Sequence, residues 1–134
     1  MILVDSSVWV DHLRASDVRL SALLDSGRVL AHPLVIAELA LSNLRKRETI
    51  LASLQDLPHA TAATDREVLV FIEKRALSGL GISYVDAHLL ASTQLTSGAS
   101  LWTRDERLLW VAERLDLANK FTASSFIGSG KENS

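Results

Sequence analysis

The chain has 134 residues, of which 48% are hydrophobic and 22% are charged, and its formal net charge is -2. This length suits one domain with a real hydrophobic core, and the charge argues against a broadly basic surface that would coat nucleic acid. With no cysteine, no apolar run near the roughly 18 residues of a membrane span and an acid as early as Asp5, we expect a cytoplasmic protein without disulfides, membrane segment or signal peptide.

Short apolar runs alternate with helical patterns along the chain, beginning with a buried strand over residues 2–5 that Asp5 closes. Ser6 or Ser7 offers the N-cap of the first helix, and Thr64 and Ser83 each have an acid three residues later, which is capping-box spacing. Further helices are expected at 18–25, from Pro33 toward Arg47, at 48–57, 64–79, 83–97 and 106–117, and further strands at 28–31, 100–103 and 121–122.

This alternation predicts an α/β fold with a small parallel sheet covered by helices on both faces. The polar, Gly/Ser-rich end of the chain predicts a flexible tail over residues 125–134, which leaves one domain over residues 1–124. Trp9, Trp102 and Trp110 each lie within an apolar pattern, so we expect them to be core anchors rather than platforms on which bases stack.

Four acidic residues stand at strand ends or on apolar helical faces: Asp5, Glu38, Asp86 and Asp105. Ligand sites of parallel sheets lie at the carboxyl ends of the strands, where Asp5 and Asp105 are expected. Each acid alone has a structural explanation, as a helix cap for Asp86 and Asp105 or as a turn residue for Asp5. Burying an ionised carboxylate is costly, so the four together predict a shared divalent cation.

The donor atoms indicate which cation this would be. Carboxylate oxygens without cysteine suit Mg²⁺ or Mn²⁺, and the four histidines show no spacing typical of a zinc site. Magnesium bound by a few carboxylates leaves positions for phosphate oxygens, and one or two such ions suffice for phosphodiester hydrolysis without a side-chain nucleophile. The histidines are His12, His32, His59 and His88.

Four segments resemble, in the same order, the motifs of PIN-domain ribonucleases, specifically the VapC-type toxins of bacterial toxin–antitoxin pairs. The resemblance covers about residues 1–120. It implies a PIN-like three-layer α/β/α sandwich with a short, mostly parallel central sheet. The segments are Ile2-Leu3-Val4-Asp5-Ser6-Ser7-Val8-Trp9-Val10-Asp11, residues 33–39 around Glu38, residues 81–91 around Asp86, and Leu101-Trp102-Thr103-Arg104-Asp105-Glu106-Arg107-Leu108.

What the resemblance implies for function is a Mg²⁺-dependent endoribonuclease, with Mn²⁺ as a substitute, that acts as the toxin of a type II toxin–antitoxin system. Asp5, Glu38, Asp86 and Asp105 would form the catalytic and metal-binding quartet, and Ser7 and Thr103 would support the carboxylates by hydrogen bonds. The expected partners are RNA involved in translation (tRNA or rRNA), a cognate antitoxin whose tail occupies the acidic groove, and a second copy of the chain in a homodimer, within a larger toxin–antitoxin hetero-oligomer.

RNA that approaches an acidic pocket needs a local basic rim. We expect Arg104, which directly precedes Asp105, to touch phosphate, with Arg45, Lys46 and Arg47 as further candidates. Two alternatives stay open at this point. One is a receiver-like or phosphatase-like α/β domain, which also gathers acids around Mg²⁺, and the other is a catalytically silent PIN-like binding module.

Overall fold

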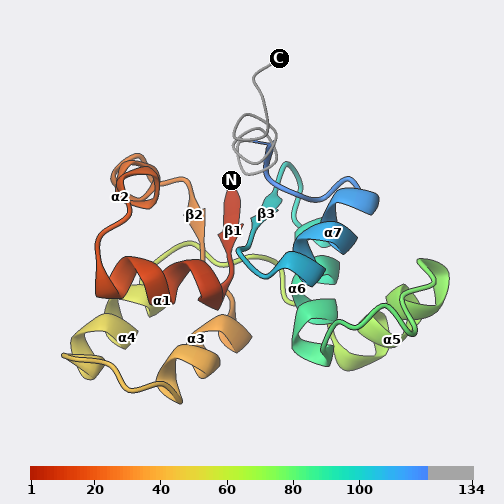
Figure 1. Cartoon of the computed structure of the whole chain (residues 1–134), viewed down its shortest axis with the longest axis horizontal. Helices are drawn as coiled ribbons and strands as arrows, with labels where there is room; N and C mark the ends of the chain where they lie inside the picture. Colours follow the sequence, from red (N-terminus) through yellow and green to blue (C-terminus); the bar gives the residue numbers. More distant parts are fainter. Residues whose placement is uncertain (121–134) are drawn as a thin grey trace.

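The computed structural model describes residues 1–120, and its centre is a three-stranded parallel sheet with the strand order β2-β1-β3 (Figure 1). Register is set by Ile2, which pairs with Val29 on one side and Ser100 on the other. All three residues of β1 are buried, as the continuous apolar run predicts for a central parallel strand. The strands are β1 (Ile2–Val4), β2 (Val29–Leu30) and β3 (Ser100–Trp102).

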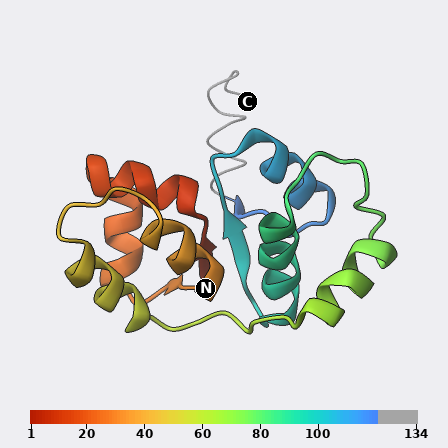
Figure 2. The same ribbon diagram turned by 90° about the horizontal axis from the view of Figure 1, so that it is seen from below.

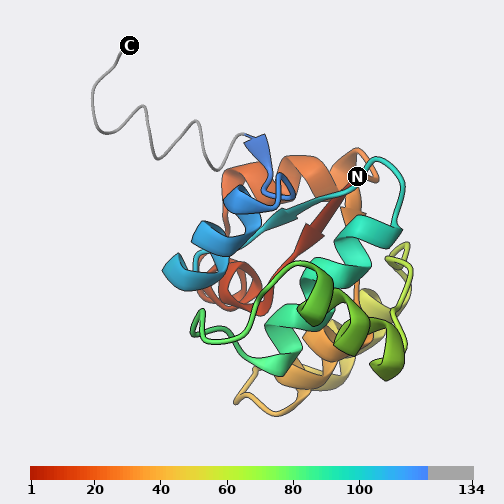
Figure 3. The same ribbon diagram turned by 90° about the vertical axis from the view of Figure 1, so that its right-hand side faces the viewer.

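Helices cover the sheet on both sides, so the predicted α/β/α sandwich is confirmed. The first four helices lie toward the β2 edge of the sheet and the last three toward the β3 edge (Figures 1 and 2), and helices flank both faces of the strands when the molecule is viewed from its right-hand side (Figure 3). The helices are α1 (Ser6–Arg14), α2 (Val18–Asp25), α3 (Pro33–Ala40), α4 (Arg47–Gln55), α5 (Asp65–Lys74), α6 (Tyr84–Leu95) and α7 (Glu106–Arg114). None of the helices in residues 1–120 is long and apolar enough to cross a membrane.

Both predicted capping boxes are present. The side chain of Thr64 accepts from the backbone N–H of Glu67 at 3.1 Å, and Glu67 accepts in return from the Thr64 N–H at 2.8 Å. Ser83 and Asp86 repeat the reciprocal pair at 3.1 Å in both directions. Each box satisfies two of the N–H groups that a helix start otherwise leaves without a partner.

Several predicted helix ends are wrong. The helix that begins at Pro33 ends at Ala40 rather than near Arg47, because the guanidinium of Arg47 donates to the Ala40 carbonyl from Nε at 3.1 Å and from Nη2 at 2.9 Å. The N-cap of α1 is Asp5 rather than Ser6 or Ser7. The predicted strand at 121–122, the domain limit at 124 and the tail at 125–134 lie outside the described residues.

Two more helices end earlier than expected, each two residues before a residue whose backbone has the left-handed conformation. Helix α5 ends at Lys74, two residues before Ala76 at φ 54°, and α7 ends at Arg114, two residues before Asp116 at φ 59°. A positive φ interrupts the helical hydrogen-bond ladder even though the apolar pattern continues past it. Leu77, beyond the end of α5, is still buried.

The tryptophans divide between core and surface. Trp9 and Trp102 are buried, as predicted, but Trp110 is 47% exposed, so the expectation of a third core anchor is wrong. Helix α7 buries Leu108, Val111 and Ala112. Trp110 falls outside the face that these three side chains form on a helix of 3.6 residues per turn.

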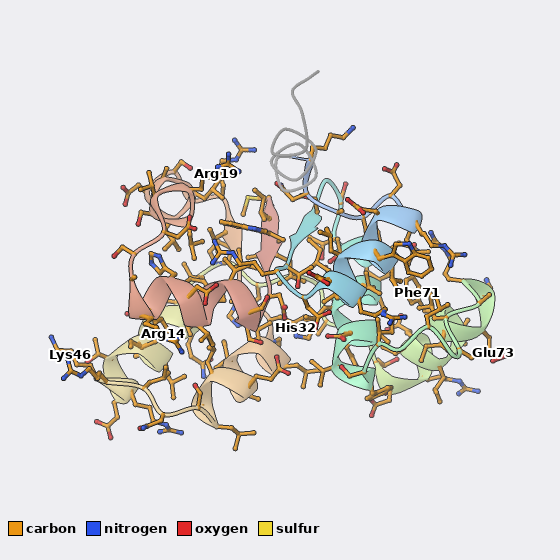
Figure 4. The ribbon with its side chains drawn as sticks, viewed as in Figure 1. Arg14, Arg19, His32, Lys46, Phe71 and Glu73 are labelled. Carbon is orange, nitrogen blue, oxygen red and sulfur yellow. The ribbon has the colours of Figure 1, made fainter. Side chains whose placement is uncertain are left out.

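A buried histidine joins the two halves of the molecule. His32 caps α3, where its Nδ1 accepts from the Leu34 N–H at 3.0 Å, and its Nε2 lies 2.9 Å from the hydroxyl of Ser92 on α6 (Figure 4). Because Nδ1 is an acceptor, the ring proton must sit on Nε2 and donate to Ser92. Burial, with smaller contributions from the charges of His88 and His59, lowers the pKa of His32 to about 4.

This histidine makes the stability of the fold depend on pH. The unfolded chain binds a proton at His32 near pH 6.5, whereas the folded chain binds it only near pH 4, so stability is fully present above pH 6.5 and is lost toward pH 4. The loss attributable to this group amounts to about 2 kcal/mol by pH 5. In urea unfolding at pH 7.5 and pH 5, His32→Asn, which can still cap α3 but does not titrate, should lose less stability than the wild-type chain.

The matched control is His59→Gln, at an exposed histidine. It should keep most of the pH dependence of the wild-type chain, because burial and not the charge of His59 is the main cause of the lowered pKa of His32. Equal loss of stability in the wild-type chain and in His32→Asn would show that His32 is not the responsible group.

Candidate functional site

Asp5 is held rigidly at the carboxyl end of β1. Its backbone N–H donates to the Trp102 carbonyl at 2.9 Å, which joins β1 to β3 at this edge. Its carboxylate Oδ2 accepts from the hydroxyl of Ser7 at 2.7 Å and from that of Thr103 at 2.8 Å. The residue is 5% exposed. A buried carboxylate is tolerated only with such donors, so these two bonds fix the orientation of Asp5.

The two hydroxyls are themselves held in place by the backbone. Ser7 Oγ accepts from the Arg104 N–H, and Thr103 Oγ1 accepts from the Asp105 N–H, each at 3.0 Å. Both hydroxyls can therefore give their proton to Asp5 and keep an acceptor position for the chain that follows β3. The network places Asp105 beside Asp5, at the edge of the sheet where the sequence predicts a site.

Glu38 on α3 and Asp86 on α6 reach the same edge from the two halves of the molecule (Figure 1). Desolvation raises the pKa of Glu38, and the charges of Asp5 and Asp86 raise it further, against a hydrogen bond from Ser6 at 2.9 Å. The pKa of Asp86 is raised by desolvation first and then by the charges of Asp5 and Asp105. Mutual repulsion of this kind means that the four carboxylates share one electrostatic environment.

Glu38 differs in one respect from its predicted setting. The apolar neighbours in its sequence suggest a position on or beside a core face, yet the residue is exposed on the second turn of α3. Val35, Ile36 and Leu39 take the buried face of that helix. Glu38 therefore stands at the border of the core, with its carboxylate turned to Ser6 and the other acids.

The structural and functional explanations of these acids hold together. Asp86 completes its capping box through Oδ2, and Asp105 caps α7 through Oδ1, which accepts from the Leu108 N–H at 2.9 Å. Each of the four acids accepts hydrogen bonds from the protein through one of its two carboxylate oxygens. Within the described residues, no hydrogen bond reaches the second oxygen of any of them: Asp5 Oδ1, Glu38 Oε2, Asp86 Oδ1 and Asp105 Oδ2.

The second oxygens form a set of hard donors that fits a divalent cation by its chemistry. No three histidine, aspartate or glutamate side chains in residues 1–120 come close enough to hold one ion together. Mg²⁺ usually takes one or two carboxylates and keeps several waters, so the observed spacing suits an ion bound partly through water. The imidazoles of His32 and His88 are engaged elsewhere and are not expected to bind this cation. His32 forms a hydrogen bond with Ser92, and His88 forms one with Asp65.

The predicted basic rim has a different arrangement. Arg104 donates to Asp11 at 2.7 Å and to Asp17 at 2.5 Å, so two carboxylates already neutralise it. Arg47 caps α3, and Lys46 lies at the outer edge of the molecule, beside α4 (Figure 4). Nothing in the spacing of Asp11 and Asp17 along the sequence indicates that they pair with Arg104, because those contacts span 93 and 87 residues.

Comparison with known proteins gives a consistent result. The family model of the PIN domain matches residues 2–114 of this chain. The chain is 50% identical over 108 residues to "Ribonuclease VapC32" of Mycobacterium tuberculosis, from strain CDC 1551 / Oshkosh and equally from strain ATCC 25618 / H37Rv. In both cases the match spans 81% of this chain and 87% of the relative.

Charge repulsion at the site predicts a variant that is more stable than the wild-type chain. A carboxyl whose pKa is raised on folding destabilises the fold at a pH where it must be ionised. Asp86→Asn removes one charge but keeps an oxygen to accept from the Ser83 N–H, so its Tm at pH 7.5 in EDTA should exceed that of the wild-type chain. The difference should shrink toward pH 4, where the wild-type carboxyls protonate.

Asp65 supplies the matched control, because hydrogen bonds from Tyr84 at 2.6 Å and from His88 at 3.0 Å lower its pKa. Asp65→Asn should therefore lower the Tm at pH 7.5, the opposite sign. If Asp86→Asn also melted below the wild-type chain at pH 7.5, repulsion among the acids would be too weak to matter.

Proposed function

The chain belongs to the PIN-domain family, and from this we propose that it is a divalent-metal-dependent endoribonuclease, the toxin of a type II toxin–antitoxin pair. A relative that is 50% identical over most of both chains is named a ribonuclease. The acidic edge of the sheet offers the matching chemistry, since phosphodiester hydrolysis at a metal site needs a rigid cage of oxygen donors and no side-chain nucleophile. Type II toxin activity follows from the resemblance of the four motifs.

The single observation that carries the proposal is the environment of Asp5. Two hydroxyls from the chain after β1 and the chain after β3 hold one of its oxygens, and the other oxygen has no protein donor within the described residues. A structural aspartate this deeply buried would be expected to use both oxygens. The unused oxygen, among three further acids, is what a cation ligand requires.

We assign the four acids unequal roles. Asp5 is buried and Asp86 half-buried, so these two would bind the cation directly, whereas the more exposed Glu38 and Asp105 would complete the cage through water. The bound ion supplies Lewis acidity toward the phosphate and its attacking water. Ser7 and Thr103 keep Asp5 in one orientation, which is the role of residues that surround metal ligands.

The partners follow from the same proposal. The substrate would be RNA involved in translation, tRNA or rRNA, in the cytoplasm, and a cognate antitoxin would occupy the acidic groove of a toxin dimer. The silent binding module is the weaker alternative, because it would have no use for a group of acids in which desolvation and neighbouring carboxylates raise the pKa of Glu38 and of Asp86. The receiver-like alternative is disfavoured, because the family model that matches residues 2–114 is that of the PIN domain.

Cleavage of RNA is the direct test. The purified chain should cut RNA in Mg²⁺ or Mn²⁺ and stop cutting in EDTA, and Asp5→Asn should reduce the rate by at least about 100-fold, since even residues that only surround ligands cost about 10- to 100-fold. Ser7→Ala and Thr103→Val should fall in that lower range. Asp25→Asn, at the exposed end of α2 near the amino end of β2, should keep the wild-type rate. Full activity in EDTA would refute the metal dependence.

Metal binding should also be visible without any substrate. A ligand that binds only the folded chain stabilises it by RT ln(1 + [L]/Kd), which is about 2.7 kcal/mol at 100 times Kd. Mg²⁺ should therefore raise the Tm of the wild-type chain in a concentration-dependent way, and it should raise that of Asp5→Asn much less. The same shift in both chains would place the ion elsewhere.

A further inference from the structure

One face of α7 carries an exposed aromatic ring between two arginines. We call Arg107, Trp110 and Arg114 the α7 stripe; they stand three and four residues apart and so share one face of the helix. Trp110 is 47% exposed, the guanidinium of Arg114 lies over its ring at 4.8 Å from the centroid, and its buried neighbours pack on the other side of the helix. The indole is thus exposed to solvent, with the guanidinium of Arg114 against one face of its ring.

A hollow opens beside this ring. It has a volume of about 350 Å³ and is lined by Glu106, Arg107 and Trp110. Arg107 Nη1 donates to the Leu80 carbonyl at 3.3 Å. The same nitrogen would lie 3.4 Å from a Cβ atom placed on Gly81, so the guanidinium packs closely against this glycine. These contacts hold Arg107 at the rim of the hollow. A planar group of the size of a nucleobase could enter there against the indole.

The stripe begins at the acidic site. Asp105 caps α7, and Trp110 follows five residues later, which is about 7.5 Å along a helix axis. Arg107 contacts residues 80 and 81, just before the helix that carries Asp86. The path from the four acids to Trp110 therefore runs between the start of α7, which Asp105 caps, and the segment before α6, which carries Asp86.

The charges of the stripe favour a polyanion. Arg104, the cation nearest to Asp105 in the sequence, is neutralised by Asp11 and Asp17, but in residues 1–120 neither Arg107 nor Arg114 forms an ion pair. Glu106 and Glu113 lie beside the stripe on one flank of α7, so phosphate should bind at the two arginines rather than on that flank. Aromatic rings combined with cations along a groove are the usual means of binding single-stranded nucleic acid.

We propose that the α7 stripe binds single-stranded RNA beside the cleavage site, with a base stacked on Trp110 and phosphates on Arg107 and Arg114. The proposal rests on the proposed ribonuclease function and identifies which residues position its substrate. Stacking of one base on an aromatic side chain contributes about 1–3 kcal/mol in such proteins. Removal of the ring should therefore weaken RNA binding by about 5- to 150-fold.

The test measures binding and cleavage separately. A fluorescein-labelled single-stranded RNA is titrated in EDTA, so that it is not cut, and its anisotropy gives Kd for the wild-type chain, Trp110→Leu, Trp110→Phe and the double variant Arg107→Gln/Arg114→Gln. Trp110→Leu should raise Kd by about 5- to 150-fold and Trp110→Phe much less, because phenylalanine still stacks. The double variant should reduce the slope of log K against log salt by about 1.4, which is 0.7 for each phosphate contact.

Leu69→Ala, at an exposed apolar side chain of α5, is the matched control and should bind like the wild-type chain. In Mg²⁺, Trp110→Leu should raise KM with little change in kcat. Unchanged Kd and KM in Trp110→Leu, in a chain that cuts RNA, would overturn the stripe and leave the ribonuclease intact. A shift of Trp110→Leu in oligomeric state alone would assign the face to protein contact and also overturn it.

The two proposals fail in different ways. If the wild-type chain binds RNA through Trp110 but cuts none in Mg²⁺ or Mn²⁺, the nuclease function is wrong and the stripe stands. If the wild-type chain neither binds nor cuts single-stranded RNA, both are wrong. Tm values of all variants, which should lie near that of the wild-type chain because the stripe is exposed, separate loss of binding from loss of folding.

Discussion

The two hydroxyl hydrogen bonds to Asp5 Oδ2 are the interaction on which the rest of the site depends. They join residues 96 positions apart, Ser7 after β1 and Thr103 after β3, through one carboxylate oxygen. The backbone N–H groups that hold these hydroxyls belong to Arg104 and Asp105, so the same network sets where α7 begins. A buried acid at a strand end thus organises the chain around itself, and its cost of burial is offset by the two hydroxyl donors.

The remaining acids show how a fold can hold charges that repel one another. Asp86 and Asp105 are each bound to the start of a helix, where backbone N–H groups and the helix dipole favour a negative charge. Glu38 has no such position and relies on Ser6 and on solvent. Desolvation and, to a smaller extent, repulsion raise the pKa of Glu38 and of Asp86, yet the capping bonds keep Asp86 in place. Helix capping and metal binding are therefore complementary uses of the two oxygens of one carboxylate.

Local sequence signals predicted much of this structure. The capping boxes at Thr64 and Ser83, the apolar run closed by Asp5 and the proline that starts α3 depend on neighbouring residues, and all appear where the pattern placed them. Features that depend on distant contacts could not be read in this way. The end of α3 is set by Arg47, and Arg104 is neutralised by acids of the N-terminal segment.

The exposure of Trp110 is another feature that local sequence could not predict. Its apolar neighbours suggested a core position, but which flank of an amphipathic helix is covered depends on what packs there, and Trp110 stays 47% exposed with Arg114 over its ring. The strand-end rule, a property of parallel sheets and not of single residues, predicted one neighbourhood for Asp5 and Asp105. The charges of Asp5 and Asp105 act on the pKa of Asp86, and those of Asp5 and Asp86 on that of Glu38, which supports one shared neighbourhood. How closely the acids approach one another needed coordinates.

Helix α6 has a consequence for how this chain tolerates change. Seven consecutive residues, Ala87 to Thr93, are buried, so the helix that carries Asp86 has no free face through its middle. A substitution there alters packing on several sides at once, and cores lose stability with even one methylene added or removed. Random variation that abolishes activity should therefore fall into two groups: a few changes at the acids that spare the fold, and many in α6 that remove the site by unfolding the chain.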